Sequence, residues 1–370
     1  MDKPGILAPE RSYGYGRDVV EVRAEGEPDW LAAKRFEAWD VWEATPMPTT
    51  RGEEWRYTDP RLLKWNAVKV ADASVGGTPD AARARLQGLT ASCRVVQVGA
   101  AAPVIELDPV LEKQGVIVLD LLAAAREHPD LVRDHLGTRA APPSAGKFAA
   151  LNGALWSGGV FVHVPAGVRI EDPIRILRWI DEPGLAYFPR TLIVAADGSQ
   201  VGVVEEFASP DFTETAFSNG VVEIYASTAA QVQYVALQQW GSGVKHMATQ
   251  RTIAGRDASL DTLVVNLGGD VARVDLNASL EGPGARSDML GLYFGQGRQH
   301  FDHFTRQEHR VPHAASDLLY KGGLDGESKA VFRGLIKVFP KAQRTDAYQT
   351  NRNLLLSKTA QATSLPNLEI

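Results

Sequence analysis

From about residue 160 onward, apolar and polar side chains alternate along short runs that are rich in β-branched residues. Alternation with a period of two, bounded by Gly, Asp and Pro, is typical of strands with one buried face. After residue 146 no helical pattern of ten residues occurs. The strands that this pattern predicts are 161–165, 191–195, 201–204, 220–225, 232–237 and 260–267.

The same region repeats a unit in which a turn is followed by a small residue and then by an alternating strand. A nearly fixed period favours a β-solenoid, in which each coil buries its face on the next. A large antiparallel sandwich or barrel is the alternative. In a solenoid the small residues would stack at corners, and Gln349, Asn351 and Asn353 would form polar ladders. The small residues are Ser199, Ala230, Ala258, Ala285, Ser328 and Ala360, at intervals of 31, 28, 27, 43 and 32 residues.

The first part of the chain has a different, partly helical pattern. Residues 30–44 lack Pro and Gly, and Asp29 is the expected N-cap. A second helical stretch covers 119–135 and is interrupted at Pro129. Five of the eight tryptophans lie between residues 30 and 65, which predicts an aromatic face buried in this region or against a partner.

Two short apolar runs, 94–98 and 116–119, predict a small sheet between these helices. The paired prolines at 142 and 143 then mark a boundary, because neither can continue a helix. We therefore expect a mainly β protein with two parts. Residues 1–140 would form an N-terminal helical or mixed α/β domain, and residues 141–370 a β-helix core.

Composition excludes several classes of function. A net charge of −6 argues against a nucleic-acid partner, because no basic excess offsets a phosphate backbone. Cys93 is the only cysteine, so the chain has no internal disulfide and cannot hold an iron–sulfur cluster through four thiolates. Its place in an apolar strand favours a buried, inert thiol over a reactive one. Residues 1–5 carry no apolar run of signal length and no stretch of 18 apolar residues occurs, so we expect a cytoplasmic protein without membrane contact.

Three separated motifs resemble one known family. Residues 53–59 read EEWRYTD, residues 148–152 read FAALN ahead of GVFVHVPAGV at 159–168, and residues 320–326 read YKGGLDG within a long match that reaches residue 356. In this order they resemble the SufB/SufD family, scaffold proteins of the SUF iron–sulfur cluster assembly system. The first motif and the lack of a cysteine cluster favour SufD over SufB.

The resemblance implies a right-handed parallel β-helix between helical ends and a scaffold rather than an enzyme. It implies a complex with a SufB-like subunit and a SufC-like ATPase, in which an iron–sulfur cluster is built at the SufB–SufD interface. A flavin (FAD) is associated with the whole complex in this family. The chain alone is expected to bind no cofactor, since it contains neither G-x-G-x-x-G after a strand nor G-x-x-x-x-G-K-[ST].

One departure from the family concerns the end of the chain. In the family, Pro-x-Leu-Glu-Ile precedes a strand with a Cys-x-His element and a helical domain that docks the ATPase. Here the equivalent residues 366–370 are the last ones. We expect a shortened version of a longer protein, in which the functional histidine and the SufC-docking region are absent.

Four of the eight histidines, at 300, 303, 309 and 313, fall within fourteen residues. Imidazole is a good ligand for iron, so His303, His309 and His313 are candidate metal ligands. On an extended strand His303 and His309 would share a face but lie about 20 Å apart. The other interpretation is a polar outer face of the solenoid, with His309 and Ser316 in packing or hydrogen bonds.

A second hypothesis is a polysaccharide-active enzyme, because β-helices also include lyases and hydrolases with acidic sites. Glu205, Glu206 and Asp261, with Lys245 and Arg251 near in sequence, would supply the groups. Adjacent glutamates point to opposite sides of a strand, which disfavours a catalytic pair. The chain also has no secretion signal and no aromatic-rich subsites.

A third interpretation, an interaction module, overlaps with the scaffold. Open solenoid ends present unpaired strand edges that can add to the sheet of a partner. The residues expected to pair with the SufB-like subunit are Leu354, Leu355, Leu356, Leu368 and Ile370. The same edge would allow a homodimer in isolation. For Trp55, packing within the N-terminal domain is favoured over direct partner binding.

Overall fold

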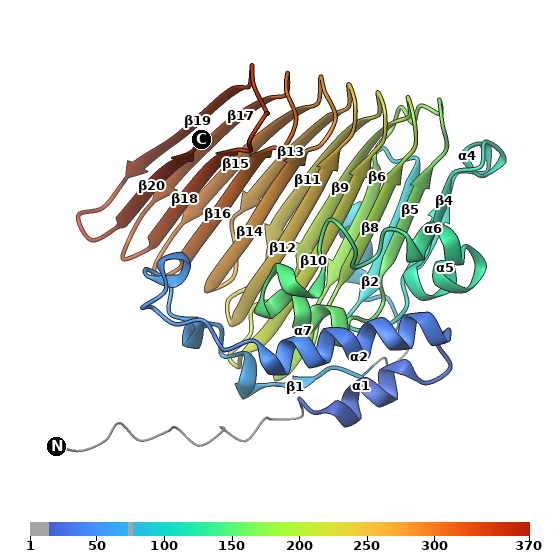
Figure 1. The fold of residues 1–370 in the computed structure, drawn as a ribbon. Coiled ribbons are helices and arrows are strands. Elements are labelled where there is room, and N and C mark those ends of the chain that lie inside the picture. The colour runs from blue at the N-terminus through green and yellow to red at the C-terminus, as the bar shows by residue number, and fades with distance from the viewer. Residues whose placement is uncertain (1–14, 73–76) are drawn as a thin grey trace.

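The computed structural model describes residues 15–72 and 77–370; the N-terminal run at 1–5 lies outside them. Two β-sheets of 11 and 9 strands face each other, here called the long and the short sheet (Figure 1). From residue 190 onward, successive strands alternate between the two sheets, and neighbours within each sheet run parallel. This arrangement is a parallel β-solenoid, so the predicted fold class is confirmed and the antiparallel alternative is excluded.

The long sheet contains β1 (Lys69–Val70), β4 (Ile117–Asp120), β5 (Val160–Val164), β7 (Leu185–Tyr187), β8 (Arg190–Ala195), β10 (Ala216–Ala226), β12 (Val244–Ala254), β14 (Val271–Leu280), β16 (His300–His309), β18 (Lys329–Val338) and β20 (Gln361–Glu369). The short sheet contains β2 (Cys93–Val98), β3 (Val104–Leu107), β6 (Ile174–Trp179), β9 (Gln200–Ala208), β11 (Gln231–Gln239), β13 (Ser259–Asn266), β15 (Arg286–Gly295), β17 (Ala315–Leu324) and β19 (Asp346–Leu355). The helices are α1 (Arg17–Ala24), α2 (Asp29–Ala44), α3 (Asp80–Leu86), α4 (Pro109–Lys113), α5 (Leu121–Glu127), α6 (Pro129–Arg133) and α7 (Lys147–Leu155), with 3₁₀ turns η1 (Glu53–Trp55), η2 (Pro60–Leu63), η3 (Trp65–Ala67) and η4 (Pro143–Ala145).

The predicted repeat follows the coils, but its small residues belong to two series. Ser199, Ala230, Ala258 and Ala285 are buried corner residues that precede strands of the short sheet. The next member of that series is Ala314, buried before β17, which the sequence reasoning missed. Ser328 and Ala360 instead precede β18 and β20 of the long sheet. The interval of 43 residues therefore joined one corner of the coil to the other, and treating the six residues as one series was wrong.

The apolar runs at 94–98 and 116–119 form β2 and β4, but they do not make a separate small sheet. β2 pairs in parallel with β6 and β4 pairs with β5, so both extend the sheets of the solenoid. At this end each sheet finishes with a reversed strand, since β3 is antiparallel to β2 and β4 is antiparallel to β5.

Helices α2 and α7 pack together and lie over the outer face of the long sheet near β8, β10 and β12 (Figure 1). The shared core includes Trp39, Phe148 and Phe217, so the tryptophan-rich region buries its aromatic face within the chain. The break of the second helical stretch at Pro129 is confirmed by the boundary between α5 and α6. The expected N-cap is wrong by one residue, because Asp29 is already helical and Pro28 precedes it. Among the described residues, no helix is both long and apolar enough to cross a membrane.

Candidate functional site

The histidine-rich segment forms β16, whose side chains alternate between two environments. His303 lies between the two sheets, where its Nε2 accepts a hydrogen bond of 2.7 Å from Nδ2 of Asn266 on β13. Its ring stacks on Tyr293 with 4.8 Å between centroids. Burial lowers the pKa of His303 to about 4, so the ring is neutral at pH 7.

His309 shares the inward face with His303, and its Nε2 lies 2.8 Å from Oγ of Ser316. The predicted hydrogen bonding of His309 and Ser316 is confirmed. The expectation of an outer polar face is wrong for His303 and His309, because both are fully buried. His313 is exposed in a left-handed turn with φ of 62°. Across the described part of the chain, no three His, Cys, Asp or Glu side chains come together as a metal site.

The other face of β16 meets the EEWRYTD motif, which lies 242 residues earlier in the chain. Oγ1 of Thr58 is 2.8 Å from Nε2 of His300 and also donates to Asp302. The guanidinium of Arg273 lies 3.9 Å from the ring centroid of Trp55 and forms an ion pair of 2.5 Å with Asp302. The motif therefore fastens the N-terminal region to the long sheet. Trp55 is buried by packing, as expected, but it packs against Arg273 and Phe148 and not within the predicted N-terminal domain.

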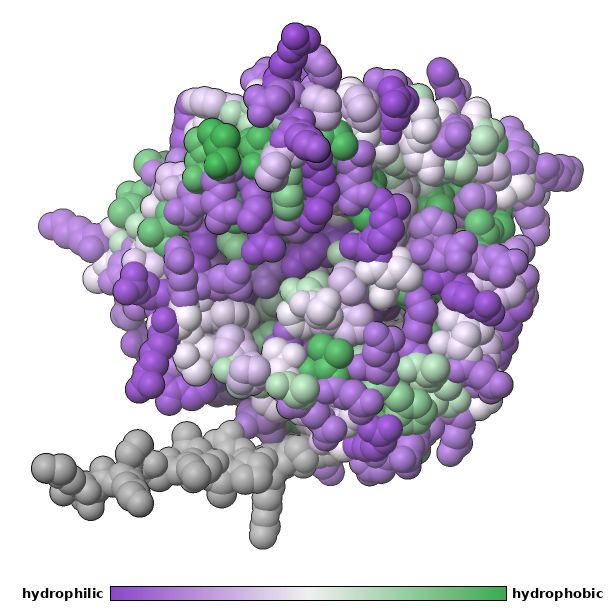
Figure 2. Space-filling model, in the orientation of Figure 1, coloured by the Kyte–Doolittle hydropathy of each residue, from purple (hydrophilic) through white to green (hydrophobic). Residues whose placement is uncertain are grey.

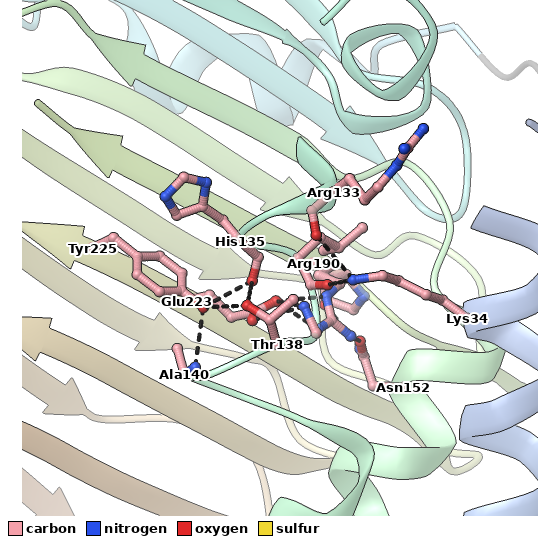
Figure 3. Close-up of polar contacts among 12 residues, drawn as sticks. Lys34, Arg133, His135, Thr138, Ala140, Asn152, Arg190, Glu223 and Tyr225 are labelled. Carbon is pink, nitrogen blue, oxygen red and sulfur yellow. Dashed lines mark hydrogen bonds and ion pairs between the residues drawn. The ribbon is translucent and has the colours of Figure 1, made fainter. Parts of the chain in front are cut away.

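A second fastening point surrounds the buried ion pair of Arg190 on β8 and Glu223 on β10 (Figure 3). The pair spans 2.5 Å, and the side chains are 3% and 0% exposed. Nη1 of Arg190 also donates to Oδ1 of Asn152 on α7, and the Gly137 amide donates to Glu223 at 2.9 Å. These bonds give the buried carboxylate and guanidinium partners from the covering segments, as buried charges require.

The loop after α6 is held over the same two strands (Figure 3). The hydroxyl of Tyr225 donates to the carbonyl of His135 at 2.8 Å and accepts from the Ala140 amide at 3.0 Å. From α2, Nζ of Lys34 donates to the carbonyl of Leu136 at 2.7 Å. Polar groups of the covering helices, of this loop and of strands β8 and β10 therefore form one hydrogen-bonded network.

The acidic residues of the polysaccharide hypothesis do not assemble a site. Glu205 is buried inside the solenoid, where it pairs with Arg178 at 2.7 Å and accepts from the Tyr234 hydroxyl at 2.7 Å. Glu206 points to the other side, as the alternation predicted, and pairs there with Arg85. Asp261 lies on the short sheet, whereas Lys245 and Arg251 lie on β12 of the long sheet. This arrangement does not favour the enzyme alternative.

Cys93 begins β2 with its side chain buried, as predicted. Burial raises the pKa of its thiol to about 12, so the thiol is protonated and a poor nucleophile or metal ligand at pH 7.

The predicted interface residues lie on or beside the last strand of each sheet, β19 and β20. Leu354, Leu355 and Leu356 are 63%, 48% and 51% exposed, and Leu368 and Ile370 are 61% and 93% exposed. Two of the polar residues predicted as ladders between coils bond to each other within one strand, since Asn353 donates to Asn351 at 2.7 Å. Tyr293 joins them to another coil: Asn351 donates to its hydroxyl, which donates to Asn353.

Comparison with known proteins identifies the family. The SufBD core domain of the SUF iron–sulfur cluster assembly system matches residues 178–370, and the SufBD N-terminal region matches residues 17–176. The chain belongs to the SufBD family. The match covers the solenoid and the covering helices, so the resemblance drawn from the three motifs is confirmed at the level of the family.

Full-length comparison finds relatives of modest identity. A SufBD family protein of Staphylococcus haemolyticus is 27% identical over 370 residues, which cover 96% of this chain and 77% of the relative. The iron–sulfur cluster assembly protein SufB of Bacillus subtilis is 27% identical over 373 residues, which cover 96% and 79%. The SufD subtype stays a prediction, because one of these relatives is named SufB and the other carries only the family name.

Two features of the site escaped sequence reasoning. Arg190–Glu223 and Arg178–Glu205 are buried pairs, and the outer face of β16 is covered rather than exposed. The buried pairs leave one signal in the sequence, a charged residue inside an otherwise apolar strand, such as Glu223 between Val222 and Ile224.

Proposed function

We propose that this chain is a scaffold subunit of SUF iron–sulfur cluster assembly in the cytoplasm, of the SufD type. It would pair with a SufB-like subunit and act together with a SufC-like ATPase. The observation that carries the proposal is the family match over residues 178–370, which coincides with most of the solenoid. The chain itself would contribute a platform for assembly rather than catalysis.

The cluster would belong to the complex and not to this chain alone. Its single cysteine is buried and protonated, and the three candidate histidines lie apart. Iron contact by His303, His309 and His313 stays a prediction, and His313 is the exposed one of the three, which groups of a partner could reach. The matched family and the relatives are named for iron–sulfur cluster assembly, and none of these names refers to FAD.

The proposed interface, here called the apolar strip, consists of two exposed groups: Leu354, Leu355 and Leu356 at the end of β19, and Leu368 and Ile370 at the end of β20. Strand addition at these edges would bury leucine side chains worth about 1.5–3 kcal/mol each when fully covered. In the absence of the SufB-like subunit, the same strip would support a homodimer.

Co-expression with SufB-like and SufC-like subunits tests the proposal by size exclusion with light scattering. We expect a complex that contains this chain and the SufB-like subunit. Failure to retain either partner would reject the SufD-type assignment.

The variant Leu355→Lys tests the interface itself. A lysine there should weaken pairing by about 2 kcal/mol, roughly 30-fold in Kd, because a charge would replace buried apolar surface. Leu292→Lys is a matched control, since Leu292 on β15 is 47% exposed and Leu355 is 48% exposed. Equal affinities for the two variants would place the interface elsewhere.

A further inference from the structure

A polar pocket of 180 Å³ lies on the outer face of the long sheet, beyond the edge of the covering helices. Strands β12, β14 and β16 form its floor, and the loop from Arg139 to Ala145 forms one wall. Figure 2 shows mainly hydrophilic residues over this part of the sheet. We call it the arginine pocket, because its lining includes Arg139, Arg251, Arg306 and Arg310.

Two carboxylates, Glu281 and Glu308, also line the pocket and leave its arginines in excess. Glu281 pairs with Arg139, and Glu308 pairs with Arg310 at 2.5 Å and more loosely with Arg306 at 4.0 Å. Arg306 reaches one further carboxylate, Glu54, at 3.4 Å. With Glu54 counted, four arginines meet three carboxylates, so one arginine is left without an ion pair in the described part of the chain.

Within the described chain, Arg251 is the one of the four arginines that forms no ion pair. Its Nη1 donates to the carbonyls of Gln250 and Asp275 at 3.1 and 2.7 Å, and it forms no ion pair with any residue in 15–72 or 77–370. Burial is the main cause that lowers the pKa of Arg251, and repulsion from Arg306 adds to it, whereas the carboxylates of Asp275, Glu308 and Glu54 act in the opposite direction. A half-buried guanidinium of this kind is stabilised further by an anion at ion-pair distance.

The strand register brings Arg251 close to Arg306, whose Nε is still without a partner among the described residues. Arg251 pairs with Asn277 and Asn277 pairs with Arg306 on adjacent strands, so the two arginine Cα atoms are about 10 Å apart across the sheet. Nε of Arg306 is buried and has no hydrogen-bond partner in the described chain. Two guanidinium groups at this spacing can close on one tetrahedral oxyanion, which they bind through paired N–H donors.

We propose that the arginine pocket binds a small phosphate-class oxyanion between Arg251 and Arg306. The volume of 180 Å³ is about that of six liquid waters, which is enough for a phosphate group with some of its hydration. Arg139 at the rim adds charge from the covering loop, so the bound anion would also tie that loop to the sheet. This site lies apart from the apolar strip on β19 and β20 and does not depend on the subunit that pairs there.

Calorimetric titration of the full chain with inorganic phosphate, at constant ionic strength, tests the site. We expect saturable binding that weakens at least tenfold in Arg251→Met and by less than twofold in Arg286→Met. Arg286 is the matched control, because it is an exposed arginine on the short sheet and its loss changes the net charge equally. A second titration with glycerol 2-phosphate separates the sources: tighter binding than phosphate indicates a phosphorylated metabolite, and weaker binding indicates the free ion.

Arg139→Met provides an independent variant, because Arg139 is 65% exposed and its loss does not threaten folding. We expect it to weaken phosphate binding several-fold even if Arg251→Met proves too unstable to purify. No saturable binding up to about 20 mM phosphate, or equal losses in the Arg139 and Arg286 variants, would overturn the proposal.

Discussion

The Arg190–Glu223 pair makes a quantitative prediction about what holds the covering helices to the solenoid. In Glu223→Gln the shape is kept, but the guanidinium of Arg190, 3% exposed, loses its countercharge. Leaving one member of a buried pair alone costs about 3–5 kcal/mol. Gln keeps one oxygen that can accept from the Gly137 amide, so we expect a loss near the lower end, about 3 kcal/mol.

Urea unfolding followed by tryptophan fluorescence measures the total loss, and hydrogen exchange over residues 134–140 measures the local one. The control is Glu327→Gln, which breaks an exposed pair with Arg298 and should change the unfolding free energy by less than about 0.5 kcal/mol. The double variant Arg190→Met, Glu223→Leu should recover at least half of the loss, since no lone charge remains buried. If Glu223→Gln is as stable as Glu327→Gln, the pair does not hold the cover, and the reasoning from burial is wrong.

Two further predictions concern the solenoid interior. Because burial lowers the pKa of His303 from about 6.5 in the unfolded chain to about 4, the unfolded state binds the proton first, and about 3 kcal/mol of stability is lost as the pH falls from 6.5 to 4. The urea midpoint should depend less steeply on pH in His303→Gln than in the unsubstituted chain, whereas the exposed control His313→Asn should keep the slope of the unsubstituted chain. Identical slopes in the two variants would contradict this prediction. In Gly322→Ala the new Cβ would lie 2.0 Å from a ring carbon of Tyr293, which costs about 1–3 kcal/mol. Gly202→Ala, with its nearest contact at 3.8 Å, should cost nothing, and equal midpoints for the two alanine variants would refute the packing explanation.

The solenoid was predictable because its corners restrict residue size. Ser199, Ala230 and Ala258 are at most 1% exposed, and their spacing of 31 and 28 residues reports the length of a coil. The two corner series could not be separated, because alanine and serine serve at both corners. Nor could the apolar run of β2 be assigned to the solenoid, since its parallel partner β6 lies about 80 residues further along the chain and periodicity says nothing about partners.

The polar contacts were less predictable, for a different reason. Alternation shows to which side of a strand a residue such as Glu223 points, but it cannot show that another part of the chain covers that side. The contact of Thr58 with His300 spans 242 residues and is invisible to any local pattern. His303 and His309 lie inside the solenoid, against the expectation of a polar outer face, and Asn266 and Ser316 on the opposite sheet supply their hydrogen-bond partners.

The reversed strands β3 and β4 make one end of the solenoid different from the other. A parallel coil is a template for the next coil, and a stack of coils can in principle extend without limit, as fibrils do. An antiparallel strand at the edge of each sheet interrupts that template at the end of the molecule nearest β2 and β5. Copies of this chain therefore cannot stack head to tail through continuous parallel sheets. Any assembly built by strand addition at the other end stops at a pair, which suits a particle of defined size and prevents a growing filament.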